Sequence, residues 1–364
     1  MIYQEELIKI SRITTRVQRK HGGKNALVGR NIHKILDFSV SINPYTPSMS
    51  KLIKLKKIKI NEYPDPTCTE LKNILAEYHN LQKSNIFIAN GSAEIITLLF
   101  FCFVNNSDTI MALWPSYGDY RYYATVTKTR FIPILVNPPN FFLNINAIID
   151  SVKLHNPKLF FFCNPTNPSG KYYSEKEVET LLDNTPRTTI FILDEAYVNF
   201  TSPKWDSIKF INKYPNLIIL RSFTKDYALT AFRIGYSVSF SELVTYLETT
   251  APSWHVNSYA QVACIQMLKD TNFLKNSVIK IKKEKLRMTK RLLKLGYEVI
   301  PSDINSFLLK VENAKRITNF LLEKNIYVRD CSSYDLPKYI RISVKKKSDN
   351  NKLLFVLKAL RKSL

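Results

Sequence analysis

Short apolar runs recur along the chain from about residue 86, and longer segments with helical spacing separate most of them. Seven of these runs have the length and composition of β-strands: NIFIA, TIMAL, RFIPILV, KLFFFC, TIFILD, LIILRS and IGYSVSF. Intervening segments such as SAEIITLLFFCFV and SEKEVETLLDN carry apolar residues at the period of an α-helix. Strands that alternate with helices predict an α/β fold with a mainly parallel sheet and helices on both faces.

The predicted strands are almost continuously apolar, as strands buried on both faces should be. We therefore expect a large domain over residues 50–254. Beyond it, a Lys-rich helical stretch over residues 259–294 precedes YEVI, SFLLKV, a helix over AKRITNFLLEK, YVRD, YIRISV and a last helix. These elements predict a smaller α+β domain over residues 255–364, with which the polar, turn-rich residues 1–49 are expected to pack.

Composition places the chain among globular proteins, since 45% of its 364 residues are apolar and roughly two domains fit this length. The cysteines are scattered and odd in number, without C-x-x-C spacing: Cys68, Cys102, Cys163, Cys264 and Cys331. This pattern indicates neither a disulfide framework nor a zinc site, so we expect reduced thiols, no metal and a cytoplasmic location.

Neither the N-terminal segment nor the longest apolar run indicates a membrane protein. The N-terminus, MIYQEELIKISR, lacks the apolar core of a signal peptide, and the longest apolar run, IITLLFFCFV, is too short to cross a bilayer. We therefore expect no membrane association.

A formal net charge of +23 makes a basic nucleic-acid-binding protein one hypothesis. However, lysine greatly exceeds arginine and is spread along the chain, and the densest run, KLIKLKKIKI (residues 51–60), alternates lysine with aliphatic residues. Such a run is typical of the solvated face of a short element. A basic field would also attract a small phosphorylated substrate, so we expect no nucleic-acid partner but keep that class as an alternative.

Polar residues follow several of the predicted strands, at the edge of a parallel sheet where ligands bind. The segment NGSAE follows NIFIA, where Gly91 permits a tight turn and the amides of Ser92 and Ala93 begin a helix. A helix N-terminus of this kind binds phosphate, although a serine there is also an ordinary helix cap.

Two further segments at this edge supply ligand-binding groups. CNPTNPSG follows KLFFFC, and its two Asn-Pro steps make a rigid turn that leaves the Asn167 amide available. TIFILD ends on Asp194, and a buried carboxylate requires a positive partner or hydrogen-bond donors. A helicase-like interpretation of the following DEA would need a G-x-x-x-x-G-K-[ST] loop, which the chain lacks.

The segment SFTKDYALTAFRIGY completes this edge, because Ser222 and Lys225 come directly after LIILR. A lysine in a pocket can have a lowered pKa and attack a carbonyl to form a Schiff base. Arg233 supplies a fixed positive charge for a phosphate, with Ser222 as a hydroxyl donor. An anion site, a carboxylate for a cationic ring nitrogen and an imine-forming lysine together predict pyridoxal 5′-phosphate as the cofactor.

With these motifs the chain resembles the fold-type I pyridoxal-phosphate enzymes of the class I/II aminotransferase superfamily, over almost its whole length. The resemblance implies that Lys225 binds the cofactor covalently, that Asp194 pairs with the pyridine nitrogen, and that Tyr117, in WPSYGDY, stacks on the ring. These three are the expected catalytic residues. It further implies that Asn167 and Tyr197 bind the ring hydroxyl, and that the phosphate is held by Ser92, Ala93, Ser222 and Arg233.

The same resemblance implies a homodimer, because Tyr63, in NEYPDPT, is expected to reach the cofactor phosphate of the neighbouring subunit. Arg341, in YIRISV, matches the arginine that takes the substrate carboxylate, and Arg329, in YVRD, is a second anion-binding arginine.

Within the superfamily, YPDPT and the spacing of YVRD to YIRIS are similar to the histidinol-phosphate aminotransferases and the threonine-phosphate decarboxylases of cobamide biosynthesis. The N-terminal segment HGGKNALVGRNIHKILDFSVSINPYTP resembles the decarboxylases, which implies substrate contacts from His21, Gly22, Gly23 and Asn43. The resulting expectation is decarboxylation of an O-phospho-L-amino acid to an aminoalkyl phosphate, with a histidinol-phosphate aminotransferase or a related pyridoxal-phosphate aminotransferase as the alternative. Phosphothreonine and phosphoserine both stay open, since one methyl group changes binding by only about 1–3 kcal/mol.

Overall fold

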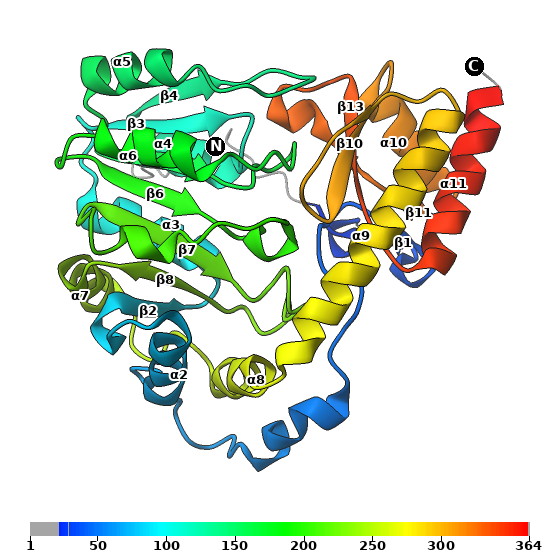
Figure 1. Cartoon of the computed structure of the whole chain (residues 1–364). Helices are drawn as coiled ribbons and strands as arrows, with labels where there is room; N and C mark the ends of the chain where they lie inside the picture. The colour runs from blue at the N-terminus through cyan, green and yellow to red at the C-terminus, as the bar shows by residue number, and fades with distance from the viewer. Residues whose placement is uncertain (1–21, 28, 363–364) are drawn as a thin grey trace, which may run out of the picture.

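The computed structural model describes residues 22–27 and 29–362, and its largest sheet has the strand order β2-β8-β7-β6-β5-β3-β4 (Figure 1). All seven predicted runs form these strands, and the pairs from β4 to β7 are parallel, whereas β8 is antiparallel to both β2 and β7. The predicted mainly parallel α/β sheet is therefore confirmed. The strand bounds are β2 (Ile86–Ala89), β3 (Thr109–Trp114), β4 (Arg130–Leu135), β5 (Leu159–Cys163), β6 (Ile190–Asp194), β7 (Leu217–Ser222) and β8 (Gly235–Ser239).

Helices cover both faces of this sheet, which explains why the strands are apolar at consecutive positions. Phe161 and Ile192 face the layer of α3 (Ser92–Phe103), α4 (Gly118–Val126) and α7 (Ser241–Thr250). Their neighbours Phe160 and Phe191 face the opposite layer, since successive strand residues point to opposite sides. That layer contains α2 (Thr69–His79), α5 (Ile145–His155), α6 (Glu175–Asp183) and α8 (Ser258–Leu268).

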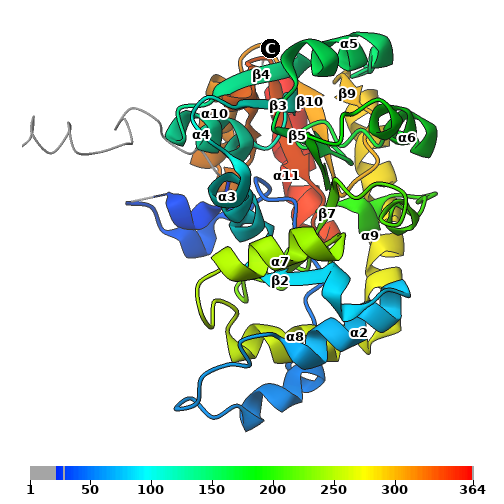
Figure 2. The same ribbon diagram turned by 90° about the vertical axis from the view of Figure 1, so that its left-hand side faces the viewer.

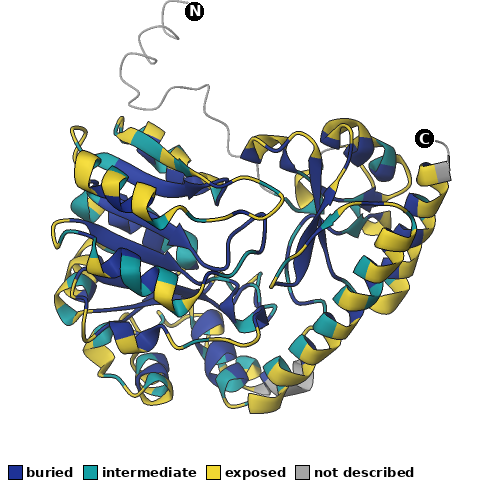
Figure 3. Cartoon of the chain, turned by 45° about the horizontal axis from the view of Figure 1, so that its top comes forward, coloured by how far each residue is buried: buried dark blue, intermediate teal, exposed yellow. Residues whose placement is uncertain are grey.

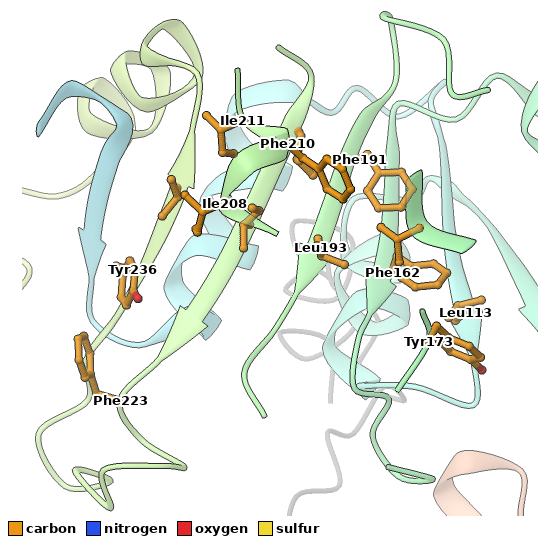
Figure 4. Close-up of a cluster of buried hydrophobic side chains, with 14 of the residues drawn as sticks. Leu113, Phe162, Tyr173, Phe191, Leu193, Ile208, Phe210, Ile211, Phe223 and Tyr236 are labelled. Carbon is orange, nitrogen blue, oxygen red and sulfur yellow. The ribbon is translucent and has the colours of Figure 1, made fainter. Parts of the chain in front are cut away.

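The core of the second layer is rich in aromatic side chains. Figure 4 shows Phe162, Phe191 and Leu193 from neighbouring strands beside Phe210 from the segment that connects β6 to β7. Burying each side chain of this size contributes about 1.5–3 kcal/mol. Apart from the edge strand β4, the strands of this sheet are almost completely buried (Figure 3), so their carboxyl ends are fixed points on which a site can be built.

The C-terminal part forms a second sheet with the strand order β12-β13-β10-β9, whose strands all pair antiparallel. Its strands are β9 (Val299–Ile300), β10 (Ser306–Lys310), β12 (Arg329–Asp330) and β13 (Tyr339–Ser343). The helices α9 (Thr271–Lys294), α10 (Ala314–Glu323) and α11 (Lys347–Lys362) accompany it, on the right of Figure 1. Met288, Ile317 and Leu353, one from each helix, share the apolar cluster between this sheet and its helices.

Residues near the N-terminus join this second part of the chain. The strand β1 (Leu36–Asp37) pairs in parallel with β11 (Ile326–Tyr327), which lies beside α10. The Lys-rich run at residues 51–60 lies largely in the 3-10 helix η3 (Met49–Lys57), where Lys54, Lys56 and Lys57 are exposed.

The predicted single helical stretch at residues 259–294 is in fact two helices, α8 and α9. They are separated at Asp270, whose carboxylate accepts a hydrogen bond from the Phe273 backbone N–H and caps the N-terminus of α9. Figure 2, a view from the side, shows α8 next to α2, and Ala263 and Cys264 of α8 belong to the core of the large sheet. The predicted domain boundary at residue 254 stays a prediction. No helix in the described residues is long and apolar enough to cross a membrane.

Candidate cofactor site

A cavity of about 390 Å³ lies at the carboxyl ends of the parallel strands and is closed on the other side by residues of the C-terminal part. Most of the residues predicted from the sequence to form a site line it. These residues are Gly22, Ser92, Ala93, Tyr117, Asn167, Asp194, Tyr197, Ser222, Lys225, Arg233 and Arg341. In the described parts of the chain, no cluster of three or more His, Cys, Asp or Glu residues is placed to bind a metal.

One end of the cavity is built to hold an anion. Gly91, with φ +85°, precedes α3, so the first N–H groups of that helix face the cavity at Ser92 and Ala93. A methyl group added at Gly91 would lie only 2.9 Å from Arg233 Nη2, and one at Gly235 only 2.7 Å from the Ser92 nitrogen. The two glycines thus keep a guanidinium next to a positive helix end, an arrangement that favours a bound phosphate.

At the opposite end, Asp194 is buried at the last position of β6. Its Oδ2 accepts a hydrogen bond of 2.5 Å from the Tyr120 hydroxyl, and its Oδ1 accepts one of 3.1 Å from the Ala196 backbone N–H. Burial raises the pKa of Asp194, whereas both donors and the nearby Lys225 lower it. A cationic ring nitrogen beside this carboxylate would stabilise its ionised form further.

Tyr120 and Cys163 are site residues that the sequence reasoning missed. Tyr120 is fully buried on α4 and stacks on Phe161, with ring centroids 4.4 Å apart. Cys163 ends β5 in register with Asp194 and lines the cavity, and burial raises the pKa of its thiol. Tyr120 follows Tyr117 by three residues, one helical turn, and this spacing in WPSYGDY was the available signal.

Lys225 follows β7 by three residues and lines the cavity. Burial lowers its pKa to about 8, with the positive charges of Arg341 and Arg233 acting in the same direction and Asp194 opposing them. A substantial fraction of this amine is therefore neutral near pH 8, which is the nucleophilic form.

The two predicted ring-hydroxyl residues and the predicted stacking residue surround Lys225. Asn167 and Tyr197 are buried, and burial raises the pKa of Tyr197, which keeps its phenol protonated as a donor. Tyr117 is the residue before α4, and its hydroxyl donates to Asp119 Oδ2 at 3.0 Å. Ser222 Oγ accepts a hydrogen bond of 3.2 Å from the Thr224 backbone N–H. This bond ties the end of β7 to the loop after it, which carries Lys225 and is here called the lysine loop.

Arg341 reaches the cavity from β13 and is held by two acceptors. Its Nη1 donates to Asn167 Oδ1, and its Nη2 donates to the Ser39 carbonyl at 2.8 Å. Its Nε has no hydrogen-bond partner among the described residues, although it is buried. A buried guanidinium with donor capacity left over is a recognition group for an anionic part of a ligand.

Arg329, the second predicted anion-binding arginine, pairs with Arg341 across β12 and β13, directly opposite it in register. It does not line the cavity. Its Nη2 donates to Ser333 Oγ at 3.0 Å, and its guanidinium lies 5.3 Å from the ring centre of Tyr334. Tyr334 itself lines the cavity, so Arg329 contacts a residue of the cavity wall without lining the cavity.

Asn43 was predicted to bind substrate but does not line the cavity. It is buried, and its Nδ2 donates to the Asp226 carbonyl at 2.7 Å and to Ser277 Oγ at 2.8 Å. Its amide is thus used within the protein, next to the lysine loop.

Of the predicted N-terminal loop, Gly22 and Gly23 are described and His21 lies outside the described residues. Gly22 lines the cavity, and a methyl group added there would lie 2.8 Å from the Ser39 carbonyl oxygen. The Gly23 N–H donates to Ser39 Oγ at 2.8 Å. Tyr63, predicted to act in the neighbouring subunit, is 78% exposed, stacks on Trp254 with ring centroids 4.5 Å apart and does not line this cavity.

The sequence matches the family described as aminotransferase class I and II over residues 33–357. The chain belongs to this family. A curated histidinol-phosphate aminotransferase from Caldanaerobacter subterraneus subsp. tengcongensis is 34% identical over 306 residues, which cover 84% of this chain and 86% of that protein. Seven further curated histidinol-phosphate aminotransferases are 31–34% identical.

Solved structures of the class I and II family share the fold. The histidinol-phosphate aminotransferase of Sinorhizobium meliloti in complex with pyridoxal-5′-phosphate has a TM-score of 0.88 at 23% identity and covers 97% of this chain and 98% of its own. The L-threonine-O-3-phosphate decarboxylase of Porphyromonas gingivalis has a TM-score of 0.76 at 23% identity and covers 89% and 99%. The predicted superfamily, the fold-type I architecture and the cofactor, pyridoxal 5′-phosphate, are therefore confirmed.

The cavity of this class I and II family member fits that cofactor. The helix end and Arg233 suit its phosphate, Asp194 suits its ring nitrogen, and Lys225 lies between them. When bound, the cofactor supplies an electron sink for negative charge at the carbon that bears the substrate amine.

Proposed function

We propose that the protein is an aminotransferase that acts on a phosphorylated amine, with histidinol phosphate as the amino donor and 2-oxoglutarate as the acceptor. This is the alternative that the sequence left beside decarboxylation. The relatives at 31–34% identity support it, because each is a curated histidinol-phosphate aminotransferase matched over most of its length.

The observation that carries the proposal is the position of Arg341 between Asn167 and Ser39. Asn167 is the predicted ligand of the ring hydroxyl, so its contact with Arg341 holds the guanidinium beside the ring. The carboxylate of 2-oxoglutarate, or of the glutamate formed from it, lies near the plane of the ring when bound to such an arginine and is retained, and histidinol phosphate has no carboxylate to lose. The Cα hydrogen is then the group that can align with the ring π system, and its loss leads to transamination.

Three residues have distinct roles in this proposal. Lys225, once its amine is free, moves the proton at the substrate Cα as a general base and acid. Asp194 keeps the ring nitrogen protonated, and Tyr120 holds the Asp194 carboxylate in position. Arg341 orients the 2-oxoglutarate carboxylate and, in the other half-reaction, the donor phosphate.

The test is a product assay on the cofactor-loaded protein. It is incubated with L-histidinol phosphate, O-phospho-L-threonine or O-phospho-L-serine, each with and without 2-oxoglutarate, and glutamate and carbon dioxide are measured. We expect glutamate only with histidinol phosphate and 2-oxoglutarate together. Carbon dioxide released from a phosphoamino acid without any oxo acid would contradict the proposal, and Lys225→Ala serves as the inactive control.

Decarboxylation of an O-phospho-L-amino acid is the second candidate, and one observation favours it. Gly22 and Gly23 lie against Ser39 at the edge of the cavity, as expected for a glycine-rich loop that contacts a substrate phosphate. If the arginines took the phosphate in place of the carboxylate, the carboxylate would be free to leave the ring plane. The product assay separates the two reactions directly.

We further propose a homodimer in which Tyr63 completes the phosphate site of the partner. Its ring is exposed and lies outside its own subunit's cavity, as a residue that serves another subunit should be. Analytical ultracentrifugation of the purified protein should give about twice the 42.3 kDa mass of the chain. A Tyr63→Phe variant should bind the cofactor more weakly, because it removes the hydroxyl that would reach the phosphate.

A further inference from the structure

Residues 39–43, here called the bridging segment, contact the catalytic lysine and the substrate-binding arginine at opposite ends. At the first end, the Ser39 carbonyl accepts a hydrogen bond of 2.8 Å from Arg341 Nη2. At the other, the Asn43 backbone N–H donates to the Lys225 carbonyl at 2.8 Å, and its side-chain Nδ2 donates to the next carbonyl, that of Asp226, at 2.7 Å. One short segment therefore fixes two groups that reach the cavity from different sheets.

The bridging segment is itself held on both sides. The Ser41 hydroxyl lies 3.1 Å from Ser343 Oγ, and Ser343, on the same strand as Arg341, donates its backbone N–H to the Phe38 carbonyl at 3.0 Å. Ser39, Ser41 and Asn43 are almost fully buried. A segment attached at this many points cannot absorb a displacement locally. A displacement at one end of the bridging segment is therefore transmitted to the other end.

Asn43 also ties the lysine loop to helix α9. Its Nδ2 donates to Ser277 Oγ at 2.8 Å, and its Oδ1 accepts a hydrogen bond of 3.0 Å from the Tyr45 backbone N–H. Both polar atoms of the side chain are thereby satisfied by protein groups. This use of the amide explains why Asn43, predicted to contact substrate, does not line the cavity.

We propose that the bridging segment couples Arg341 to Lys225, and that Asn43 is the positioning residue that sets the lysine backbone. An anion bound by Arg341 then stabilises the conformation in which Lys225 is in place for proton transfer. The inference rests on the roles proposed above for Lys225 and Arg341, but it does not depend on which substrate is turned over.

Proton transfer by Lys225 tolerates only a small displacement of the reacting groups. Proton transfer requires the lysine nitrogen within hydrogen-bond reach of Cα, and a displacement of about 1 Å at a reacting group can cost about 100-fold in rate. Lys225 has a long, flexible side chain, so the position of its backbone decides where the amine can reach. In the described parts of the chain, the consecutive carbonyls of Lys225 and Asp226 both accept hydrogen bonds from Asn43, and this makes Asn43 the residue to test.

The first experiment uses cofactor-free protein, so it is independent of the reaction. The rate of acetylation of Lys225 by acetic anhydride is measured against pH by mass spectrometry of the peptide, for the unmodified protein and for Asn43→Ala. We expect the apparent pKa of Lys225 to rise toward its ordinary value in the variant. The amine would then leave the position in which burial, Arg341 and Arg233 lower its pKa and Asp194 raises it.

Asn216→Ala is the matched control. Asn216 is also a buried asparagine whose Nδ2 donates to two backbone carbonyls, those of Pro186 and Thr189, at 3.2 and 2.8 Å. It precedes the first residue of β7, whereas Lys225 follows the last, so it lies at the far edge of the sheet. We expect this variant to lose similar thermal stability while the acetylation profile of Lys225 stays unchanged.

The second experiment is a double-mutant cycle on the loaded enzyme, with Asn43→Ala and Arg341→Lys alone and together. If the segment couples the two residues, the combined loss in kcat/KM is smaller than the product of the single losses by about threefold to tenfold. Asn43→Ala alone should lower kcat by about tenfold or more, with little change in KM. Additive losses, together with an unchanged acetylation profile in Asn43→Ala, would overturn the proposal.

Ser277→Ala provides a second variant should Asn43→Ala fold poorly. It removes only the acceptor on α9 and leaves both carbonyl contacts of Asn43 available. We expect a smaller shift in the same direction, and no shift in this variant would also contradict the proposal. The product assay and the acetylation experiment can fail separately. If no substrate is turned over but the acetylation profile of Asn43→Ala is shifted, the proposed function is rejected and the proposed coupling is retained.

Discussion

The Tyr120 hydroxyl donates a 2.5 Å hydrogen bond to Asp194 Oδ2, across 74 positions of the sequence. Both residues are buried, and the Tyr120 ring is fixed by stacking on Phe161. A donor to a carboxylate favours its ionised form, so Tyr120 acts against the burial that raises the pKa of Asp194. Tyr120 therefore keeps Asp194 charged opposite the position predicted for the cofactor ring nitrogen.

Replacing Tyr120 with phenylalanine should weaken this effect while preserving the ring. Hydrogen bonds to charged groups contribute about 1.5–3 kcal/mol, so kcat should fall by about tenfold or more. The pKa of Asp194 should rise, and the acidic limb of the kcat–pH profile should move to higher pH. Steady-state kinetics across pH measure both changes.

Tyr297→Phe is the control for Tyr120→Phe. The Tyr297 hydroxyl donates to the Leu357 carbonyl at 2.9 Å in the core of the C-terminal part, so its loss affects stability and not the cavity. An acidic limb displaced equally in both variants would show that Tyr120 has no specific role at Asp194.

Lys225→Met should stabilise the cofactor-free protein near neutral pH. The folded-state pKa of about 8 lies below the ordinary 10.5, so between these values the unfolded chain binds more protons. The free energy of unfolding should therefore rise with pH through this interval, and the variant should lack that contribution. Urea unfolding at about pH 7 and about pH 9.5 measures the slope, and equal slopes in both proteins would argue against a lowered lysine pKa.

Arg221→Met should be strongly destabilising. Arg221 Nη2 lies 2.6 Å from Glu195 Oε2, and the two side chains are 8% and 0% exposed, so the substitution leaves a buried carboxylate without its cation. We expect a loss of about 3–5 kcal/mol in the free energy of unfolding, measured by urea denaturation. Glu195→Gln added to Arg221→Met should recover part of it.

The surface pair of Lys310 and Glu298, 2.8 Å apart and about half exposed, is the comparison for the buried pair. Lys310→Met should cost no more than about 1 kcal/mol. Similar losses for Arg221→Met and Lys310→Met would contradict the importance assigned to burial.

Gly170→Ala should displace the loop that carries Asn167. Gly170 has φ +74°, and a methyl group there would lie 2.0 Å from Ser302 Oγ and 2.9 Å from Ile304 Cγ1. The loop and the C-terminal part must then separate, which disturbs the contact of Asn167 with Arg341. We expect kcat/KM to fall by about tenfold or more, in line with the cost of misplacing a binding group.

Gly29→Ala is the control that distinguishes the collision expected in Gly170→Ala from the strain of placing alanine at a positive φ. Gly29 has φ +77° but nothing within 4 Å of an added methyl group, so this variant should lose stability without losing activity. Adding Ser302→Gly to Gly170→Ala should restore part of kcat/KM, and no restoration would indicate that strain alone is responsible.

The sequence predicted which residues line the cavity better than it predicted what each of them contacts. Lys225, Asp194 and Ser92 line one cavity, as the sequence led us to expect, because each lies at or just after the end of a strand and the carboxyl ends of parallel strands share one edge. Tyr120 was missed because its contact with Asp194 depends on how α4 turns back over the sheet, which strand periodicity does not encode.

Residues outside the parallel sheet were harder to interpret. Both Arg329 and Arg341 lie in short strand motifs, yet of these two only Arg341 lines the cavity, whereas Arg329 donates to Ser333 and lies over the ring of Tyr334. Asn43 was assigned to substrate, whereas its partners are Ser277 and the carbonyl of Asp226. The contacts of Asn43 depend on packing between segments more than 180 residues apart, about which local sequence carries no signal.

The parallel pairing of β1 with β11, Leu36 opposite Ile326, has a consequence for how the protein is made. At a synthesis rate of about 5–20 residues per second, β1 emerges roughly 15–60 s before the strand that holds it. The large sheet and the loop that carries Lys225 can fold during that delay, but Ser39 can gain its contact with Arg341 only after β13 has been translated. The last step of folding on the ribosome would then be the one that makes the enzyme competent, so an incomplete chain would be left without activity.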